Sequence, residues 1–328
     1  MLKHRVFMLA CAFAAAVSAS WAADAGRYAT VLKKALIAPR LDATVLARLK
    51  DNGYDGVELS DRKATVEEAR AARVLAEANG IRIHSFMGGW FMFNSPERYA
   101  GEMDLARHSI RLAAAYGADV MLMVPYKVVK QGVKGPPPAE YEPEFDPATL
   151  RMTRCVRGDN TPYADYIAEQ NNATECAKRA VRELVPLAAE QGVTLALENV
   201  GGHWFWAKPA FARALVKHFK SPYVKFYLDL GNNVLFCPPE QWLDMMPDET
   251  IRLHVKDHEA LPGGTKRDAP LGLGSIDYHA IRQSIERNGY SGWVSVETNR
   301  RSDAEHAEFM DAFFAGRVPA RGYLFGRK

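Results

Sequence analysis

Four short apolar stretches in the second half of the chain each end in a side chain that commonly binds metal ions. They lie roughly 25 to 45 residues apart, the length of one strand–helix unit in a repeating α/β fold. A single acidic residue at a strand end is usually a helix cap or a surface charge, but four in phase with the repeat indicate a shared site. Three carboxylates and one imidazole suit a hard divalent cation. The predicted metal ligands are Glu198, Asp229, His254 and Glu297.

If the four stretches are parallel strands of one barrel, their ligands meet at its carboxyl-terminal mouth, where further polar side chains are expected. Lys256 lies two residues after His254 and shares its face of the strand, so it should point into the mouth. An unpaired buried ammonium is costly, so Lys256 needs a carboxylate partner or a polar substrate. Asp257 follows on the exit loop as a candidate substrate contact. Glu58 and His84 are expected to end the second and third strands and to reach the same mouth as further candidate substrate contacts, although a lone histidine such as His84 is more often part of the core.

Strand and helix patterns alternate eight times along the chain. The predicted strands are residues 32–38, 56–60, 82–86, 120–125, 193–200, 224–230, 251–256 and 293–298. Eight such units predict a right-handed parallel (β/α)₈ TIM barrel that forms a single domain over residues 23–328. The alternative is an open doubly wound sheet, but the nearest glycine cluster, residues 272–275, follows no strand and so lacks the phosphate-binding pattern.

Residues 127–163 interrupt the regular spacing after the fourth strand. They are rich in proline and charge and show no clear period, and connections of this length inside a compact domain are usually functional or disordered. Because this insertion follows a strand, it should rise on the mouth side, as a lid would. Its aromatic residues, Tyr141, Phe145 and Tyr163, make it less solvent-like than a flexible linker, which is the alternative.

Aromatic side chains also follow two of the predicted strands. Trp90 comes after the third strand, and His203 and Trp204 come after the fifth. Such residues are frequently core, but both groups stand beside glycine pairs in loops, which favours a binding surface for a carbohydrate.

The N-terminal residues predict a secretory signal. A basic segment at residues 3–5 precedes an apolar run at 6–17, and small residues at 20 and 22 suit a signal peptidase, so cleavage is expected near Ala22 and the mature protein in the periplasm. The apolar run is too short for a stable membrane anchor. Cleavage removes two positive charges and no negative one, so the net charge falls from +3 to +1. No basic stripe remains, which argues against a nucleic-acid partner.

Signal removal would leave three cysteines, Cys155, Cys176 and Cys237, none with zinc-type or redox spacing. In an oxidising compartment Cys155 and Cys176 could form a disulfide, and the alternative is that all three are free, buried thiols.

Five motifs carry a resemblance to a known family. In chain order they are Gly-Val-Glu-Leu, Leu-Glu-Asn, Leu-Asp-Leu-Gly-Asn, His-Val-Lys-Asp and Val-Glu-Thr. Together they resemble the xylose-isomerase-like TIM-barrel family, which includes ketose 3-epimerases, hydroxypyruvate isomerases, inosose dehydratases and apurinic-site endonucleases. The resemblance extends from about residue 33 to about residue 314.

The resemblance implies that Glu198, Asp229, His254 and Glu297 hold manganese, magnesium or cobalt, with zinc as a further candidate. It also implies that Glu198 and Glu297 flank the substrate and move protons. A cation that polarises a carbonyl acidifies the neighbouring C–H, and a carboxylate can then remove that proton. Reprotonation elsewhere gives an isomer or epimer, whereas expulsion of a β-substituent gives the product of a lyase.

Departures from the family pattern separate its branches. The endonucleases carry further histidines that this chain lacks, and Asn232 stands three residues after the predicted metal aspartate. Ketose 3-epimerases usually have histidine at that position and an arginine six residues after the metal histidine, where this chain has Ala260. Asn232 is therefore a candidate substrate contact, and Arg267 a candidate substitute for the arginine. His-Val-Lys-Asp is closer to the dehydratase-like branch, which would make Lys256 a contact for substrate or leaving group.

The sequence therefore predicts a divalent-metal-dependent isomerase or epimerase. It would abstract a proton next to a ketone of a carbohydrate, which should be non-phosphorylated because sugar phosphates are scarce outside the cytoplasm. One alternative is a lyase that β-eliminates from a 3-keto-glycoside or dehydrates an inosose. Another is a non-catalytic carbohydrate-binding barrel, which the presence of both Glu198 and Glu297 disfavours. The sequence leaves the sugar, the metal and the oligomeric state open.

Overall fold

The computed structural model describes residues 28–126, 133–200 and 207–325. The predicted signal segment, residues 1–22, lies outside these ranges. His203 and Trp204 lie outside them as well, so their predicted substrate contacts stay predictions.

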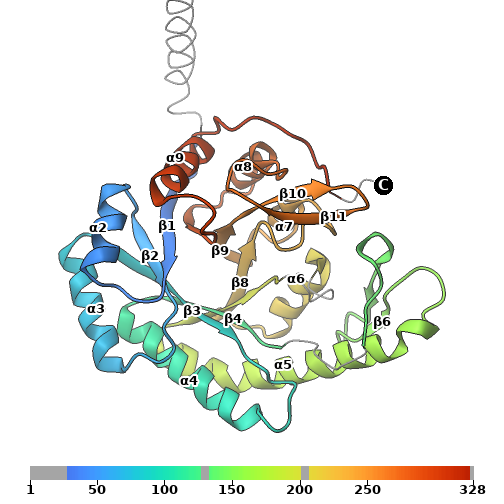
Figure 1. Ribbon diagram of the computed structural model, residues 1–328. Coiled ribbons are helices and arrows are strands. Elements are labelled where there is room, and N and C mark those ends of the chain that lie inside the picture. The colour runs from blue at the N-terminus through green and yellow to red at the C-terminus, as the bar shows by residue number, and fades with distance from the viewer. Residues whose placement is uncertain (1–27, 127–132, 201–206, 326–328) are drawn as a thin grey trace, which may run out of the picture.

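Eight parallel strands close into a barrel in the order β1-β12-β9-β8-β7-β4-β3-β2, which confirms the predicted (β/α)₈ fold (Figure 1). The strands are β1 (Leu32–Ala38), β2 (Gly56–Leu59), β3 (Arg82–Trp90), β4 (Val120–Val124), β7 (Thr194–Glu198), β8 (Val224–Asp229), β9 (Thr250–Val255) and β12 (Gly292–Val296). Because every strand is parallel, all of their carboxyl ends open on one face, and side chains from distant parts of the chain can meet there.

Helices surround the barrel (Figure 1). They are α2 (Ala43–Asp51), α3 (Val66–Ala78), α4 (Tyr99–Tyr116), α5 (Ala164–Gln191), α6 (Pro209–His218), α7 (Pro239–Met245), α8 (Tyr278–Arg287) and α9 (Asp303–Phe314). The side chain of Asp42 caps the start of α2, and Thr65 forms a capping box with Glu68 at the start of α3. Among the residues that the structure describes, no helix is long and apolar enough to cross a membrane.

Strand β3 is longer than predicted, because Gly88 and Gly89 continue the strand instead of ending it. The ladder with β4 shifts register between Met87 and Gly89. A Cβ on Gly88 would lie 2.8 Å from the carbonyl oxygen of Leu122, so this close approach of two strands requires glycine. As a result His84 is an early residue of a nine-residue strand and not its end.

The insertion after β4 is folded over its described part. It contains two 3₁₀ turns, Pro138–Glu140 and Thr161–Tyr163, and a small antiparallel sheet of β5 (Glu144–Phe145) and β6 (Met152–Arg154). Asn171 of α5 fixes this sheet, because its side chain accepts from the backbone N–H of Met152 at 2.6 Å and donates to its carbonyl at 3.0 Å. The ring of Tyr141 is buried against that of Phe236 in the loop after β8, with centroids 5.6 Å apart. This segment is therefore no structureless linker, and its action as a lid stays a prediction.

The three described cysteines are free. Cys155 is buried inside the insertion, where its backbone N–H donates to the side chain of Asn160 at 2.8 Å. Cys176 lies partly exposed on α5. The structure thus favours free thiols over the Cys155–Cys176 disulfide.

Candidate metal centre

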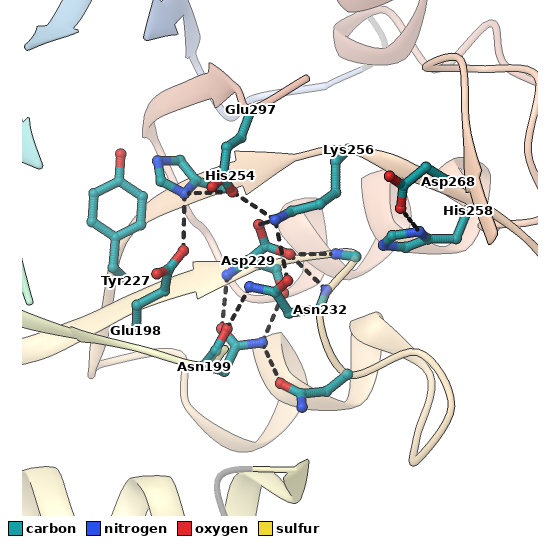
Figure 2. A network of polar contacts seen from close by, with 12 residues as sticks. Glu198, Asn199, Tyr227, Asp229, Asn232, His254, Lys256, His258, Asp268 and Glu297 are labelled. Carbon is teal, nitrogen blue, oxygen red and sulfur yellow. Dashed lines mark hydrogen bonds and ion pairs between the residues drawn. The ribbon is translucent and has the colours of Figure 1, made fainter. Parts of the chain in front are cut away.

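The four predicted ligands converge at the carboxyl-terminal mouth of the barrel (Figure 2). Glu198 ends β7, Asp229 ends β8, His254 lies in β9, and Glu297 directly follows β12. One ligand atom from each lies within 4.8 Å of the others. Ligand oxygens lie about 2.0 to 2.6 Å from a hard divalent cation, so donors on opposite sides of one ion are about 4 to 5 Å apart. The spacing and the chemistry of this donor set therefore fit a single divalent cation.

His254 joins the ligand cluster to Glu58, which lies below the cluster in the barrel interior. Its Nδ1 lies 3.1 Å from Oε1 of Glu198 and 3.3 Å from Oε2 of Glu297, whereas its Nε2 lies 2.8 Å from Oε2 of Glu58. Burial by itself would lower the pKa of His254, but the oxygens of Tyr227, Glu58 and Glu297 outweigh burial and raise that pKa well above its usual range. Without a cation the imidazole therefore carries a proton on each nitrogen, and metal binding must release the one on Nδ1.

Asp229 is held by the turn that follows it. Its Oδ1 accepts the backbone N–H groups of Gly231 at 2.8 Å and Asn232 at 2.6 Å, which leaves Oδ2 directed at the cluster. Asn199, the residue after Glu198, pairs with the backbone of Asp229 through both its amide nitrogen and its oxygen, each at 2.8 Å. These contacts lock the ends of β7 and β8 together, so two ligands share one rigid support.

Lys256 points into the mouth, as predicted, and has two carboxylate partners there (Figure 2). Its Nζ lies 3.0 Å from Oδ2 of Asp229 and 2.7 Å from Oε2 of Glu297, and it donates to Oδ1 of Asn232 at 3.1 Å. Burial lowers the pKa of Lys256, but these two carboxylates raise it by more. A Cβ on Gly231 would lie 2.5 Å from Cγ of Lys256, so glycine is needed for the lysine to pass this turn.

The two glutamates of the cluster differ in their protonation. Burial raises the pKa of Glu198 to about 7. Burial acts the same way on Glu297, but His254 and Lys256 outweigh it and lower the pKa of Glu297 below its usual range. Burial also raises the pKa of Asp229, to about 6. Near neutral pH and without a cation, Glu297 is therefore ionised while Glu198 holds a proton for part of the time.

An apolar wall stands in the barrel interior beside the cluster. Trp90, the last residue of β3, packs against a group of inner side chains that includes Val124, Val200 and Tyr227. Trp90 thus lies in the strand itself and not in a loop after it, and its contact with a carbohydrate stays a prediction. Asn232 is also at the mouth, although both ends of its side-chain amide already have partners in Lys256 and Asn199.

Two predicted mouth residues lie deeper than expected. His84 stacks on the ring of Trp293, with centroids 4.5 Å apart, and its Nε2 lies 3.0 Å from Oγ of Ser295. The expectation that His84 ends its strand at the mouth is wrong because β3 continues for six residues beyond it. Glu58 is fully buried directly beneath His254 and does not line the mouth.

Two other predicted contacts are displaced by an antiparallel hairpin, β10 (Asp257–Leu261) and β11 (Thr265–Ala269), which follows β9. Asp257 accepts the backbone N–H groups of Gly272, Gly274 and Ile276, so it fastens the loop after the hairpin and has no free oxygen for a substrate. Arg267 is exposed on the outer face, where it pairs with Glu259 at 2.7 Å.

Lys266 is the hairpin residue that turns inward in place of Arg267. Its Nζ donates to the carbonyl oxygens of Gly231 at 2.8 Å and Asn232 at 3.1 Å, at the turn that holds Asp229. Burial lowers its pKa to about 8. The sequence interpretation missed Lys266, and it also missed Asn199 and Tyr227. The two-residue alternation of a hairpin would have separated Lys266 from Arg267 if the hairpin itself had been predicted.

Comparison with known families agrees with this architecture. The sequence profile of the xylose isomerase-like TIM barrel family matches residues 46–313. The chain belongs to this family.

Among curated relatives, L-ribulose-5-phosphate 3-epimerase UlaE of Escherichia coli O1:K1 / APEC is 27% identical over 139 residues, which are 41% of this chain and 47% of the relative. The chain thus spans about half the length of the curated relatives that it matches. Among solved structures, the 3-keto-D-glucoside 4-epimerase YcjR from E. coli has a TM-score of 0.62 at 16% identity, over 86% of this chain and 98% of that one. The IolI protein with a bound zinc atom has a TM-score of 0.64 at 15% identity, over 88% and 99%.

Proposed function

We propose that this protein is a divalent-metal-dependent isomerase or epimerase that abstracts a proton next to a ketone of a non-phosphorylated carbohydrate. One observation carries the proposal: Glu198 and Glu297 approach the same nitrogen of His254 from opposite sides of β9, at 3.1 and 3.3 Å. Two carboxylates placed in this way can remove a proton from one side of a substrate carbon and return a proton to the other side. Membership of a family that includes sugar epimerases supports the reaction class.

Glu198, Asp229, His254 and Glu297 would hold the cation. Their oxygen-rich set favours manganese, magnesium or cobalt, and the imidazole makes zinc a further candidate. When bound, the cation supplies Lewis-acid polarisation of the substrate carbonyl.

The side chains divide the proton transfer between them. Glu297, ionised beside His254 and Lys256, is the candidate base that removes the proton. Glu198, on the other side of β9, is the candidate group that returns a proton to the substrate from that side. The ammonium of Lys256 lies in the same mouth and can stabilise negative charge that develops on a substrate oxygen. Trp90 would provide an apolar face for the carbohydrate.

Hydrogen exchange with solvent tests this function directly. The mature protein with added Mn²⁺ would be incubated in deuterated water with a panel of free ketoses and oxidised glycosides. An isomerase or epimerase places deuterium on the carbon next to the carbonyl, and the Glu297→Gln variant should lose this exchange. Tight binding without exchange or turnover would instead identify a non-catalytic carbohydrate-binding barrel.

A lyase is the second candidate, and the position of Lys256 favours it. This ammonium lies at the mouth within 3.1 Å of Asn232 and could contact a departing β-substituent. A lyase would release an enone and the β-substituent, and Lys256→Met should slow that release more than the deuterium exchange. Exchange without release would exclude this candidate.

We also propose that residues 1–22 direct export and are removed. The basic, apolar and small-residue segments of the N-terminus support this location. Mass spectrometry of the periplasmic protein should find a mature terminus near Ala23, whereas an intact Met1 in the cytoplasmic fraction would overturn it.

A further inference from the structure

Below the ligand cluster, the carboxylate of Glu58 lies in the barrel interior with no exposure to solvent. It has three hydrogen-bond partners. Oγ of Ser85 donates to Oε1 at 3.0 Å, the hydroxyl of Tyr227 donates to Oε2 at 2.7 Å, and Nε2 of His254 lies 2.8 Å from the same Oε2. A buried carboxylate is tolerated when hydrogen-bond donors satisfy it, and these three neighbours satisfy both oxygens of Glu58.

The ring of His254 lies between Glu58 and the mouth. Its Nε2 faces Glu58 below, and its Nδ1 faces Glu198 and Glu297 at the mouth. The two nitrogens therefore contact different groups. The hydroxyls of Ser85 and Tyr227 already donate to the two oxygens of Glu58, so Glu58 is the acceptor in this group and Nε2 of His254 is the donor of the third contact. Nδ1 is then the nitrogen left to bind a cation.

Tyr227 holds the same ring from a second direction. Its ring centroid lies 4.3 Å from that of His254, at an angle of 48°, and its hydroxyl meets the carboxylate of Glu58. The orientation of the imidazole is therefore fixed by packing and by a hydrogen bond together. Both contacts come from residues that lie beneath the cluster.

We propose that Glu58 is a positioning residue of the metal centre, which keeps the proton of His254 on Nε2 and directs Nδ1 to the cation. This inference rests on the proposed function, because it needs the four ligands to bind a metal. It replaces the sequence-based interpretation of Glu58 as a substrate contact, since the ring of His254 separates Glu58 from the mouth. Hydrogen-bond partners of metal-bound histidines typically contribute about 10- to 100-fold to metal affinity.

Metal affinity separates this role from a purely structural one. Protein freed of metal by a chelator would be titrated with Mn²⁺ alone by calorimetry, with no substrate present. We expect Glu58→Gln to bind Mn²⁺ about 10- to 100-fold more weakly than the wild type. Ser85→Ala is the matched control, because it removes a donor to the other oxygen of Glu58 and leaves the oxygen that faces His254. It should lower thermal stability while its Mn²⁺ affinity stays close to that of the wild type.

The possible results distinguish this inference from the proposed function. If the wild type does not bind Mn²⁺, Mg²⁺, Co²⁺ or Zn²⁺, the proposed function fails and this inference fails with it. If the wild type binds Mn²⁺ and Glu58→Gln binds it equally well, the positioning role is overturned and the function stands. Equal loss of affinity in Glu58→Gln and Ser85→Ala would also overturn it, since general damage to the core would explain both.

A second measurement applies if Glu58→Gln does not fold. Nitrogen-15 spectra of histidine-labelled wild-type protein report which ring nitrogen carries the proton and which binds a metal. In the zinc-loaded protein, His254 should show a protonated Nε2 and a metal-bound Nδ1. A metal-bound Nε2 would overturn the proposal.

Discussion

The two halves of the barrel contribute differently to the same mouth. Each of the later strands, β7, β8, β9 and β12, brings one of the four converging groups at or directly after its carboxyl end. The earlier strands bring Glu58 below the cluster and Trp90 beside it. The later half therefore carries the reactive groups, and the earlier half supports these groups from below and shapes the wall of the mouth. Substitutions of the four converging groups should therefore abolish activity, whereas those of Glu58 or Trp90 should adjust it.

The largest effect is expected for the two glutamates at the mouth. Glu198→Gln and Glu297→Gln keep the shape of each side chain but remove a group that can take up a proton. Loss of a general acid or base typically costs on the order of 10²–10⁴ in rate, so kcat should fall by that much while substrate affinity changes less. Glu259→Gln, on the exposed hairpin, is the control and should retain wild-type kcat. Undiminished turnover in both mouth variants would contradict the division between the halves.

Metal content is the next test of the division between the two halves of the barrel. The purified protein should carry about one divalent ion per chain, as expected for a single oxygen-rich site. Asp229→Ala and His254→Ala should be strongly depleted of metal with the fold retained, because each removes one of four donors. Trp90→Ala, from the earlier half, should keep its metal. Elemental analysis and circular dichroism measure both properties, and full occupancy in the two ligand variants would reject the assignment.

The raised pKa values of Glu198, about 7, and Asp229, about 6, make the effect of a cation on stability depend on pH. Both values lie above those of the unfolded chain, so the protonated forms stabilise the metal-free fold at acidic pH. This stabilisation is complete below about pH 4 and is lost as the pH rises through about 6 to 7. A cation needs the ionised forms, so the rise in melting temperature on adding Mn²⁺ should be larger near pH 8 than near pH 5.5.

Glu297 acts in the opposite direction, since its lowered pKa contributes stability that is fully present above about pH 4.5 and is lost only as the pH falls below that value, outside this window. Differential scanning fluorimetry of wild type and Glu198→Gln checks the prediction. The variant should show a weaker dependence of the Mn²⁺ effect on pH. An equal effect at both pH values in the wild type would show that these carboxyls do not limit binding.

The sequence predicted the later half of the barrel better than the earlier half, for a physical reason. Glu198, Asp229 and His254 stand at or near the ends of strands whose apolar runs are clear, and the repeat places them on one face. The error at His84 arose because Gly88 and Gly89, which usually mark a turn, here lie within β3, where Gly88 permits the close approach to β4 and Gly89 has a positive φ. A single sequence contains no signal that separates these two uses of glycine.

The hairpin after β9 shows a second limit. It consists mostly of polar residues, so nothing in its hydrophobic pattern distinguished it from a loop, and the inward and outward positions could not be assigned. Lys266 and Arg267 are adjacent cations in sequence, but only Lys266 reaches the turn that holds Asp229. The folded part of the insertion was missed for a related reason, since Asn171 fixes Met152 through a contact between distant parts of the chain.

The smallest effect is expected within that hairpin. Lys266 and Arg267 are adjacent in sequence, so they test whether contact with the mouth decides the effect of a substitution on stability and metal binding. Lys266→Met leaves the carbonyl oxygens of Gly231 and Asn232 without their donor, which typically costs about 1 to 3 kcal/mol. Arg267→Met breaks only an exposed ion pair with Glu259, worth about 0 to 1 kcal/mol. Urea unfolding measures both changes. Because Lys266 supports the turn after Asp229, its replacement should also weaken Mn²⁺ binding, whereas Arg267→Met should leave binding unchanged. If the two variants prove equal in both measurements, the inward direction of Lys266 has no consequence, and the hairpin belongs with the supporting parts of the barrel.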